Sequence, residues 1–197
     1  MATYDRKDAA YRRAKDEGYR SRAAYKLIEL DSHFALLRPG LRVVDLGCWP
    51  GAWMQVASRK VGSGGRVVGV DVVEMETLGL PNAIELRGDV TDPRVRASVS
   101  SALGGPADLV LADLAPKLSG IAAADAARHA TLVEAAIAGA TEWLRPEGGL
   151  LVKLFMDAEY RSLIAQLGAA FRAVKTRRAE STRKGSAELY ACARGLR

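Results

Sequence analysis

A lysine stands inside an apolar segment near the end of the chain. Lys153 interrupts the run "GLLVKLF" at residues 149–155. Burial of an unpaired ammonium group is unfavourable, so this side chain must reach a counter-charge, a cleft or an exposed sheet edge. Asp113 lies near the end of another apolar segment, residues 107–115. If these segments are adjacent parallel strands, Asp113 and Lys153 meet at the carboxyl edge of the sheet, where a doubly wound fold binds its ligands.

A glycine-rich turn follows the apolar segment 41–46. Its glycines, Gly47 and Gly51, allow the backbone to approach a ligand, and the start of a following helix offers free N–H groups. The turn lacks the third glycine of a dinucleotide fingerprint and the Gly-Lys-Ser/Thr of a P-loop. Asp45 at its start would repel a phosphate, but it could hold an ammonium group directly or through water.

Aspartates also lie at the ends of the next two apolar segments, residues 65–73 and 83–90. A carboxylate at the position of Asp71 commonly accepts hydrogen bonds from ribose hydroxyls, and Asp89 could accept one from an adenine amino group. Any one of these residues could be a simple turn residue. Three acidic strand ends in succession around a glycine turn favour S-adenosylmethionine over NAD as the ligand.

The elements that position these residues alternate between strands and helices. Apolar, β-branched runs predict strands, helical spacing predicts the segments between them, and the two closing extended segments are too close in sequence for a crossover helix, so they pair antiparallel. We therefore predict an α/β fold, a single doubly wound Rossmann-like domain with a mostly parallel seven-stranded sheet and a C-terminal antiparallel strand. The predicted strands are 41–46, 65–73, 83–90, 107–115, 149–155, 172–181 and 188–195, and the predicted helices are 23–34, 52–60, 93–103, 125–144 and 157–170.

Composition agrees with one cytoplasmic domain covering residues 1–197. The chain is 49% hydrophobic and 26% charged, its N-terminus is too charged for a signal peptide, and no apolar run is long enough to span a membrane. Cys48 and Cys192 form no disulfide framework. No metal site is expected, since these cysteines and the histidines lack ligand spacing. We expect His33 and His129 on helix surfaces and Cys192 as a small buried filler.

The net charge of +6 is concentrated at the two ends of the chain. Residues 1–26 hold 8 basic and 4 acidic side chains, and residues 172–197 hold 8 and 2. Tyrosines are interspersed among the N-terminal charges, a mixture that suits nucleic acid. We predict a basic N-terminal RNA-binding segment at about residues 1–25 and an RNA-binding face made from both termini. The candidate contacts are Arg12, Arg13, Arg20, Arg22, Arg178, Arg183 and Lys184.

Nearly the whole chain resembles the FtsJ/RrmJ-like family of RNA ribose 2′-O-methyltransferases. The similar segments are "GYRSRAAYKL", "DLGCWPGAW", "DLAPKLSG", "VKLF" and "AELYACARG". The resemblance implies an S-adenosyl-L-methionine-dependent methyltransferase with a catalytic set of Lys26, Asp113, Lys153 and Glu188. In this set Lys153 is assigned as base or hydroxyl-orienting group, and Lys26 as the residue that steers the hydroxyl or a phosphate. The implied cofactor-binding residues are Asp45, Gly47, Gly51, Trp53, Asp71, Asp89 and Asp113.

The resemblance also implies the substrate, a ribose 2′-hydroxyl of large-subunit 23S ribosomal RNA, with uridine as the target nucleotide and a monomeric enzyme. The same chemistry on tRNA or another RNA is the alternative, and a catalytically silent RNA-binding protein is a more distant one. A nicotinamide oxidoreductase is disfavoured by the missing third glycine. The departures from the family pattern are small: Cys48, Trp49 and Ala52 in the cofactor turn, where Trp49 is expected to crowd the cofactor, and Lys117, which adds a charge near the RNA entrance.

Overall fold

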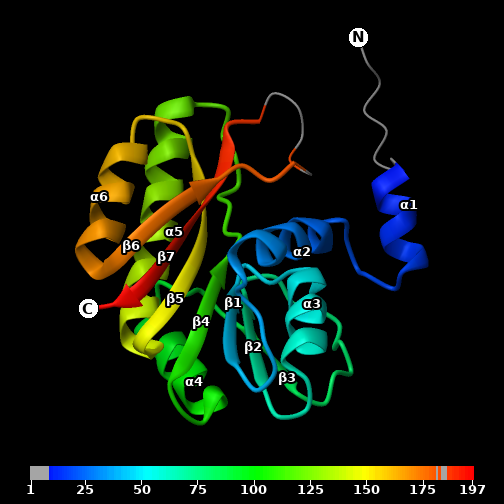
Figure 1. The fold of residues 1–197 in the computed structure, drawn as a ribbon. Helices are drawn as coiled ribbons and strands as arrows, with labels where there is room; N and C mark the ends of the chain where they lie inside the picture. The colour runs from blue at the N-terminus through cyan, green and yellow to red at the C-terminus, as the bar shows by residue number, and fades with distance from the viewer. Residues whose placement is uncertain (1–8, 181, 183–185) are drawn as a thin grey trace.

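The structure, a computed structural model, describes residues 9–180, 182 and 186–197, and its central element is a seven-stranded sheet (Figure 1). The strand order is β3-β2-β1-β4-β5-β7-β6. The strands are β1 (Arg42–Leu46), β2 (Arg66–Asp71), β3 (Ala83–Arg87), β4 (Ala107–Ala112), β5 (Leu144–Phe155), β6 (Phe171–Arg177) and β7 (Glu188–Leu196). The helices are α1 (Ala9–Asp16), α2 (Ala23–Phe34), α3 (Ala52–Val61), α4 (Pro93–Leu103), α5 (Ala122–Trp143) and α6 (Tyr160–Ala170).

The predicted topology is confirmed. Strands β3, β2, β1, β4 and β5 run parallel, joined by helical crossovers or, between β2 and β3, by a loop. The last strand, β7, lies between β5 and β6 and is antiparallel to both. The order changes direction between β1 and β4, which is where a doubly wound sheet opens a crevice at the carboxyl ends of its strands.

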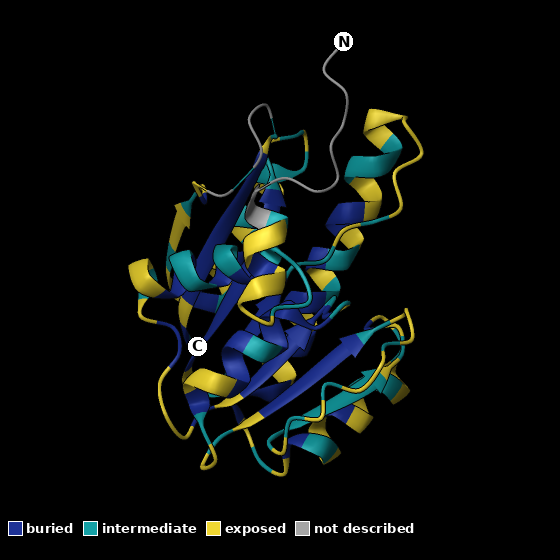
Figure 2. Ribbon diagram, turned by 90° about the vertical axis from the view of Figure 1, so that its right-hand side faces the viewer, coloured by how far each residue is buried: buried dark blue, intermediate teal, exposed yellow. Residues whose placement is uncertain are grey.

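Helices cover both faces of the sheet, and alternation along each strand decides which side chains they meet. Helices α4, α5 and α6 pack on one face, against Val44, Val110 and Val152. Helices α2 and α3 pack on the other, against Leu111 and Leu151. Figure 2 shows the result: the central strands are buried, β3 is partly exposed, β6 is mostly exposed, and the outer turns of the helices are exposed.

β6 ends at Arg177 rather than at 181, and three further strands end earlier than their apolar sequences predict. β2 ends at residue 71 rather than 73, β3 at 87 rather than 90, and β4 at 112 rather than 115. For these three strands, the residues beyond the strand line a cavity at the carboxyl edge. The apolar residues among them therefore form part of the cavity wall. Composition alone does not distinguish an apolar strand end from an apolar cavity wall.

Two other expectations need correction. β5 begins at Leu144, where the sequence predicted helix, because that residue pairs with Ala107 across an irregularity in the β4–β5 ladder. His129 is buried, with an exposed fraction of 2%, and its ring packs 4.6 Å from that of Phe155; it is not a surface residue of α5. His33 is exposed as predicted, and within the described part of the chain no helix is long and apolar enough to span a membrane.

Candidate active site

Lys153 reaches the counter-charge that its burial requires. It lies on the same face of β5 as Leu151, and its Nζ is 2.9 Å from Oδ1 of Asp113 and donates to the Asp113 backbone carbonyl at 3.1 Å. The Asp113 backbone N–H in turn donates to Leu46, so the residue that follows β4 is tied to the end of β1. The predicted meeting of Asp113 and Lys153 is thus present in the structure.

Lys26 and Glu188 form a second ion pair beside the first. Helix α2 packs on the face of the sheet that Lys153 occupies, and from there Lys26 Nζ contacts Glu188 Oε1 at 2.6 Å. The two residues are 162 positions apart in the chain. Thr182 also donates to that carboxylate oxygen, at 3.1 Å. All four members of the set implied by the resemblance are therefore gathered as two lysine–carboxylate pairs.

Tyr190 connects the two ion pairs, and it was not among the predicted site residues. It is the register partner of Lys153 across the β5–β7 ladder, its hydroxyl donates to Asp113 Oδ1 at 2.9 Å, and Lys26 Nζ lies 5.9 Å from its ring centre. Burial, with the nearby Asp113 and Glu188 carboxylates, raises the pKa of Tyr190 well above its usual value, so the hydroxyl keeps its proton and remains a donor. Its place in "AELYACARG" was the available sequence signal.

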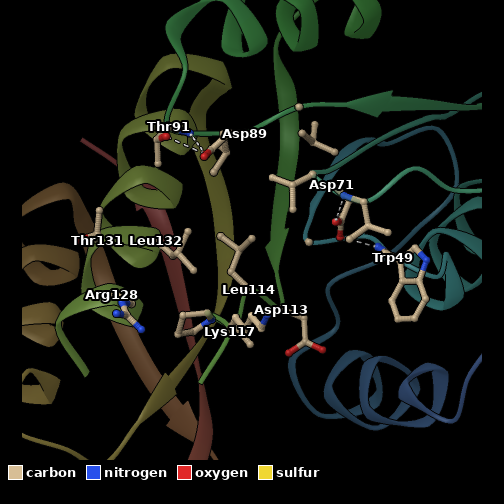
Figure 3. Close-up of a pocket in the computed structure, with 18 residues that line it drawn as sticks. Trp49, Asp71, Asp89, Thr91, Asp113, Leu114, Lys117, Arg128, Thr131 and Leu132 are labelled. Carbon is tan, nitrogen blue, oxygen red and sulfur yellow. Dashed lines mark hydrogen bonds between the residues drawn. The ribbon is translucent and has the colours of Figure 1, made fainter. Parts of the chain in front are cut away.

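A cavity of about 930 Å³ opens at the same edge of the sheet. It lies within the range of sizes that small-molecule sites occupy, roughly 300–1,000 Å³. Figure 3 shows Asp71 and Asp89 on its wall, with Asp113 below them. Asp113 thus belongs both to the cavity wall and to the ionic cluster. Lys117, Arg128 and Thr131, which are exposed or partly exposed, line the part of the wall nearest α5.

The predicted ribose and adenine carboxylates also organise the wall itself. Asp71 accepts the backbone N–H groups of Trp49 at 2.9 Å and Val73 at 2.8 Å. One Asp89 oxygen accepts both the N–H and the hydroxyl of Thr91. Each carboxylate retains acceptor capacity, since a carboxylate offers about four lone-pair positions. The indole of Trp49 is 56% exposed at the mouth of the cavity, beside Asp71 rather than filling the space (Figure 3).

Asp45 is the most unusual group near the site. It is fully buried at the end of β1, and both of its side-chain oxygens lack a hydrogen-bond partner among the described residues. Burial first, and then the charges of Asp113 and Asp71, raise its pKa well above the ordinary value. An orphaned buried carboxylate is costly. Asp45 is not among the residues that line the cavity, so its predicted contact with the cofactor stays a prediction.

The remaining residues assigned to the cofactor turn, Gly47, Gly51 and Trp53, lie against other residues of the protein. Gly47 has a positive φ of 75°, and a Cβ there would lie 3.1 Å from the Leu114 side chain. Gly51 is the N-cap of α3, with φ of 108°, and a Cβ would lie 2.8 Å from Leu78. Trp53 is buried against Tyr190 and donates its indole N–H to the Ala23 carbonyl. Of these three, Gly47 lines the cavity.

Arg20, a predicted RNA contact, clamps this turn from outside. Its guanidinium donates to the backbone carbonyls of Pro50, Glu76 and Thr77 at 3.3, 2.6 and 2.7 Å. The N-terminal segment therefore holds the cofactor turn against the loop after β2. Of the other predicted contacts, Arg13 pairs with Glu17, whereas Arg183 and Lys184 lie outside the described residues.

The FtsJ-like methyltransferase family has a sequence model that matches residues 19–196, a span that includes all four residues of the ionic cluster and the cavity wall. The chain belongs to this family. Similar curated relatives are the ribosomal RNA large subunit methyltransferases E of Paramagnetospirillum magneticum, 46% identical, and Syntrophobacter fumaroxidans, 43% identical. The first alignment covers 93% of this chain and 77% of the relative, and the second covers 99% and 98%.

Solved structures agree with this membership. A crystal structure named as a ribosomal RNA methyltransferase of Plasmodium falciparum superposes with a TM-score of 0.79 and 26% identity, covering 90% of this chain and 98% of that one. Fibrillarin of Aeropyrum pernix, with natively bound S-adenosyl-L-methionine, has a TM-score of 0.60 and 18% identity over 89% and 75%, which shows a shared fold. This methyltransferase uses S-adenosyl-L-methionine as its cofactor, and the acidic cavity fits that molecule's ribose, amino groups and cationic centre.

Proposed function

We propose that this methyltransferase modifies the 2′-hydroxyl of a ribose in large-subunit 23S ribosomal RNA, with uridine as the target nucleotide. We place the reaction on the large ribosomal subunit in the cytoplasm, carried out by a monomer. The observation that carries the proposal is the buried Lys153–Asp113 pair, joined through Tyr190 to Lys26 and Glu188, at the rim of the cofactor cavity. The relatives named as ribosomal RNA large subunit methyltransferase E support the choice of RNA.

The contacts of Lys153 define what its amino group can do. An ammonium group has three N–H donors, and Asp113 occupies two of them through a carboxylate oxygen and a backbone carbonyl. In the charged form one donor remains, and it can orient the oxygen of the 2′-hydroxyl. In the neutral form the same position holds a lone pair, which can accept the hydroxyl proton. Asp113 therefore aims Lys153 in both protonation states, and proton transfer needs no rearrangement of this pair.

The second pair supplies a separate cation for the substrate. Glu188, which also accepts from the Thr182 hydroxyl, holds the Lys26 side chain, which is 21% exposed and so can still reach a ligand. We assign Lys26 to steer the hydroxyl or the phosphate next to the target ribose, while Tyr190 keeps Asp113 in place by a hydrogen bond. S-adenosylmethionine, when bound, supplies an electrophilic methyl group on its sulfonium. Asp71 and Asp89, on the cavity wall, would hold it through its hydroxyl and amino groups, and we assign the buried Asp45 to its ammonium group.

A methyl-transfer assay on defined RNA tests this function. Purified protein with tritiated S-adenosylmethionine is incubated with large ribosomal subunits from a bacterial strain that lacks its own enzyme of this type, and separately with tRNA from that strain. Digestion and mass spectrometry should find a single 2′-O-methyluridine in 23S RNA. The Lys153→Met variant is the matched control, since it retains the cofactor cavity. Methylation of a base, of tRNA in preference to the subunit, or equal activity of the variant would contradict the proposal.

A further inference from the structure

The edge of the sheet opposite the active site is lined by arginines. At this edge the parallel strands begin and β7 ends, so it lies one strand length away from Lys153 and the cavity. Every basic side chain at these strand ends is an arginine, and all but the partly exposed Arg145 are exposed. The set, which we call the arginine edge, consists of Arg38, Arg42, Arg66, Arg145, Arg172, Arg194 and Arg197.

Two of these arginines are placed side by side. Arg42 and Arg66 are register partners at the first positions of β1 and β2, so their side chains leave neighbouring strands in the same direction. Like charges in this relation oppose strand pairing. The Arg66 guanidinium donates to the Ala102 carbonyl, and Arg42 lies beside Gly105. The Ala102 carbonyl lies in the last turn of α4, whose C-terminal end carries a partial negative charge, and Asp108 accepts the Arg42 backbone N–H at 2.7 Å while it also pairs with Arg145. These groups offset the two guanidinium charges only in part.

Carboxylates balance only part of the arginine edge. Asp108 contacts Arg145 at 2.5 Å, and Glu147 contacts Arg172. Arg194 donates to the backbone carbonyls of Phe34 and Ala35. Within the described part of the chain, Arg38, Arg42, Arg66, Arg194 and Arg197 form no ion pair with a side-chain carboxylate. The edge therefore presents a net positive charge to solvent.

The dimensions of the edge suit a polyanion better than a single small anion. From β2 to β6 the strand order has five intervals, which at about 4.8 Å per interval span about 24 Å. A planar guanidinium fork can donate two parallel hydrogen bonds to one phosphate, and this geometry distinguishes arginine from lysine as a phosphate contact. Arg42 and Arg66 stand on the face of the sheet that α4 covers and Arg194 on the face that α2 covers, so a nucleic-acid backbone that follows the edge can meet guanidinium groups from both faces.

We propose that the arginine edge binds the phosphate backbone of an RNA segment other than the one that carries the target ribose. This inference rests on the proposed function, because a folded ribosomal RNA presents several segments to one small domain. The target ribose must lie at the carboxyl edge, beside Lys153. The arginine edge lies at the opposite end of the strands. A second RNA segment therefore contacts it and orients the enzyme on the ribosomal subunit, without contact with the reacting groups.

The Arg42→Gln/Arg66→Gln variant tests the proposal, because both side chains are exposed and neither belongs to the catalytic or cofactor site. The matched control is Arg94→Gln/Arg161→Gln, which removes the same charge from exposed positions of α4 and α6. Arg42→Lys/Arg66→Lys retains the charge and should bind more nearly like the wild type. Binding to protein-free large-subunit RNA is measured over a series of KCl concentrations, with cofactor binding and methyl transfer measured on the same preparations.

The edge variant should lose about 0.7–0.9 in the slope of log affinity against log salt for each phosphate contact removed. Its KM for the RNA should rise, with kcat and cofactor affinity unchanged. The same slope for the edge variant and the control overturns the inference, and so does weaker binding to intact subunits with unchanged binding to RNA, which would indicate a protein contact. A reduced slope in an enzyme that methylates no ribosomal RNA would refute the proposed function and leave RNA binding by this edge standing.

Discussion

Replacement of Asp113 by asparagine separates the structural role of the buried ion pair from its chemical role. Asp113→Asn keeps the shape of the side chain and an acceptor for Tyr190, but it leaves the Lys153 ammonium without a counter-charge. The lysine side chain is 7% exposed, so water cannot replace the lost carboxylate. The variant should therefore be destabilised and inactive at the same time.

The expected size follows from the burial of the two partners. Removal of one member of a buried pair costs about 3–5 kcal/mol. We expect the lower end, about 3 kcal/mol, because Asp113 is 19% exposed and Lys153 keeps the backbone carbonyl. For a chain of this length, that corresponds to a loss of about 6–12 °C in melting temperature. Lys153→Met should cost less, since the carboxylate left behind is partly hydrated and still accepts from Tyr190.

The double variant Asp113→Asn/Lys153→Met separates the effect of the ion pair on stability from its effect on methyl transfer. A buried ion pair can often be replaced by neutral groups with little change in stability, so the double variant should melt within a few degrees of the wild type. Methyl transfer in single-turnover assays should stay about 10²–10⁴-fold below wild type in all three variants. Calorimetric melting and quenched-flow methylation measure the two quantities on the same samples.

Two results would refute this reasoning. An Asp113→Asn variant that melts with the wild type would show that the pair is not coupled in the folded protein. A double variant that regains methyl transfer along with stability would show that the lysine acts only as scaffold.

Three further predictions concern the cofactor cavity. The pKa of Asp45 is raised in the folded protein, chiefly by burial, so the native protein holds a proton that the unfolded chain releases near pH 4, and the stability of the fold must decrease as the pH rises above that value. The Asp45→Asn variant should lose this decrease and, without cofactor, should melt at a higher temperature than the wild type at pH 8. Equal dependence of melting temperature on pH in the two proteins would contradict the prediction. Asp71→Ala should lower the affinity for S-adenosylhomocysteine by about 10–150-fold in titration calorimetry, the equivalent of one charged hydrogen bond, and unchanged affinity would remove Asp71 from the site. Trp49 is exposed whereas Trp53 and Trp143 are buried, so the change in tryptophan fluorescence on cofactor binding should vanish in Trp49→Phe; a persistent signal would locate the response elsewhere.

The sequence alone determined the strand–helix alternation, the topology class and the charged groups at the carboxyl edge of the sheet. Continuous apolar strands need cover on both faces, and the short link before the last strand forces an antiparallel pair. An ammonium group inside the strand 149–155 needs a counter-charge, and the sequence alone indicates Asp113 as its partner. These inferences succeed because they depend on local composition and on the cost of burying charge.

Tertiary structure decided which partners meet and which residues line the cavity. Lys26 and Glu188 are 162 positions apart, and only the packing of α2 against the face of β5 and β7 brings them together. The tyrosine opposite Lys153 joins the pairs because of the β5–β7 register. Trp53, assigned to the cofactor from its motif, is instead buried against that tyrosine.

The arginine edge also depends on strand order. The arginines of this edge are scattered along the sequence as single charges. Those near the C-terminus are part of the basic C-terminal segment. The register of β1 and β2 pairs Arg42 with Arg66, and the antiparallel course of β7 returns Arg194 and Arg197 to the same end of the sheet. Local sequence encodes propensity and burial, whereas proximity between distant segments arises from the packing of the whole sheet, and that is what only the tertiary structure decides.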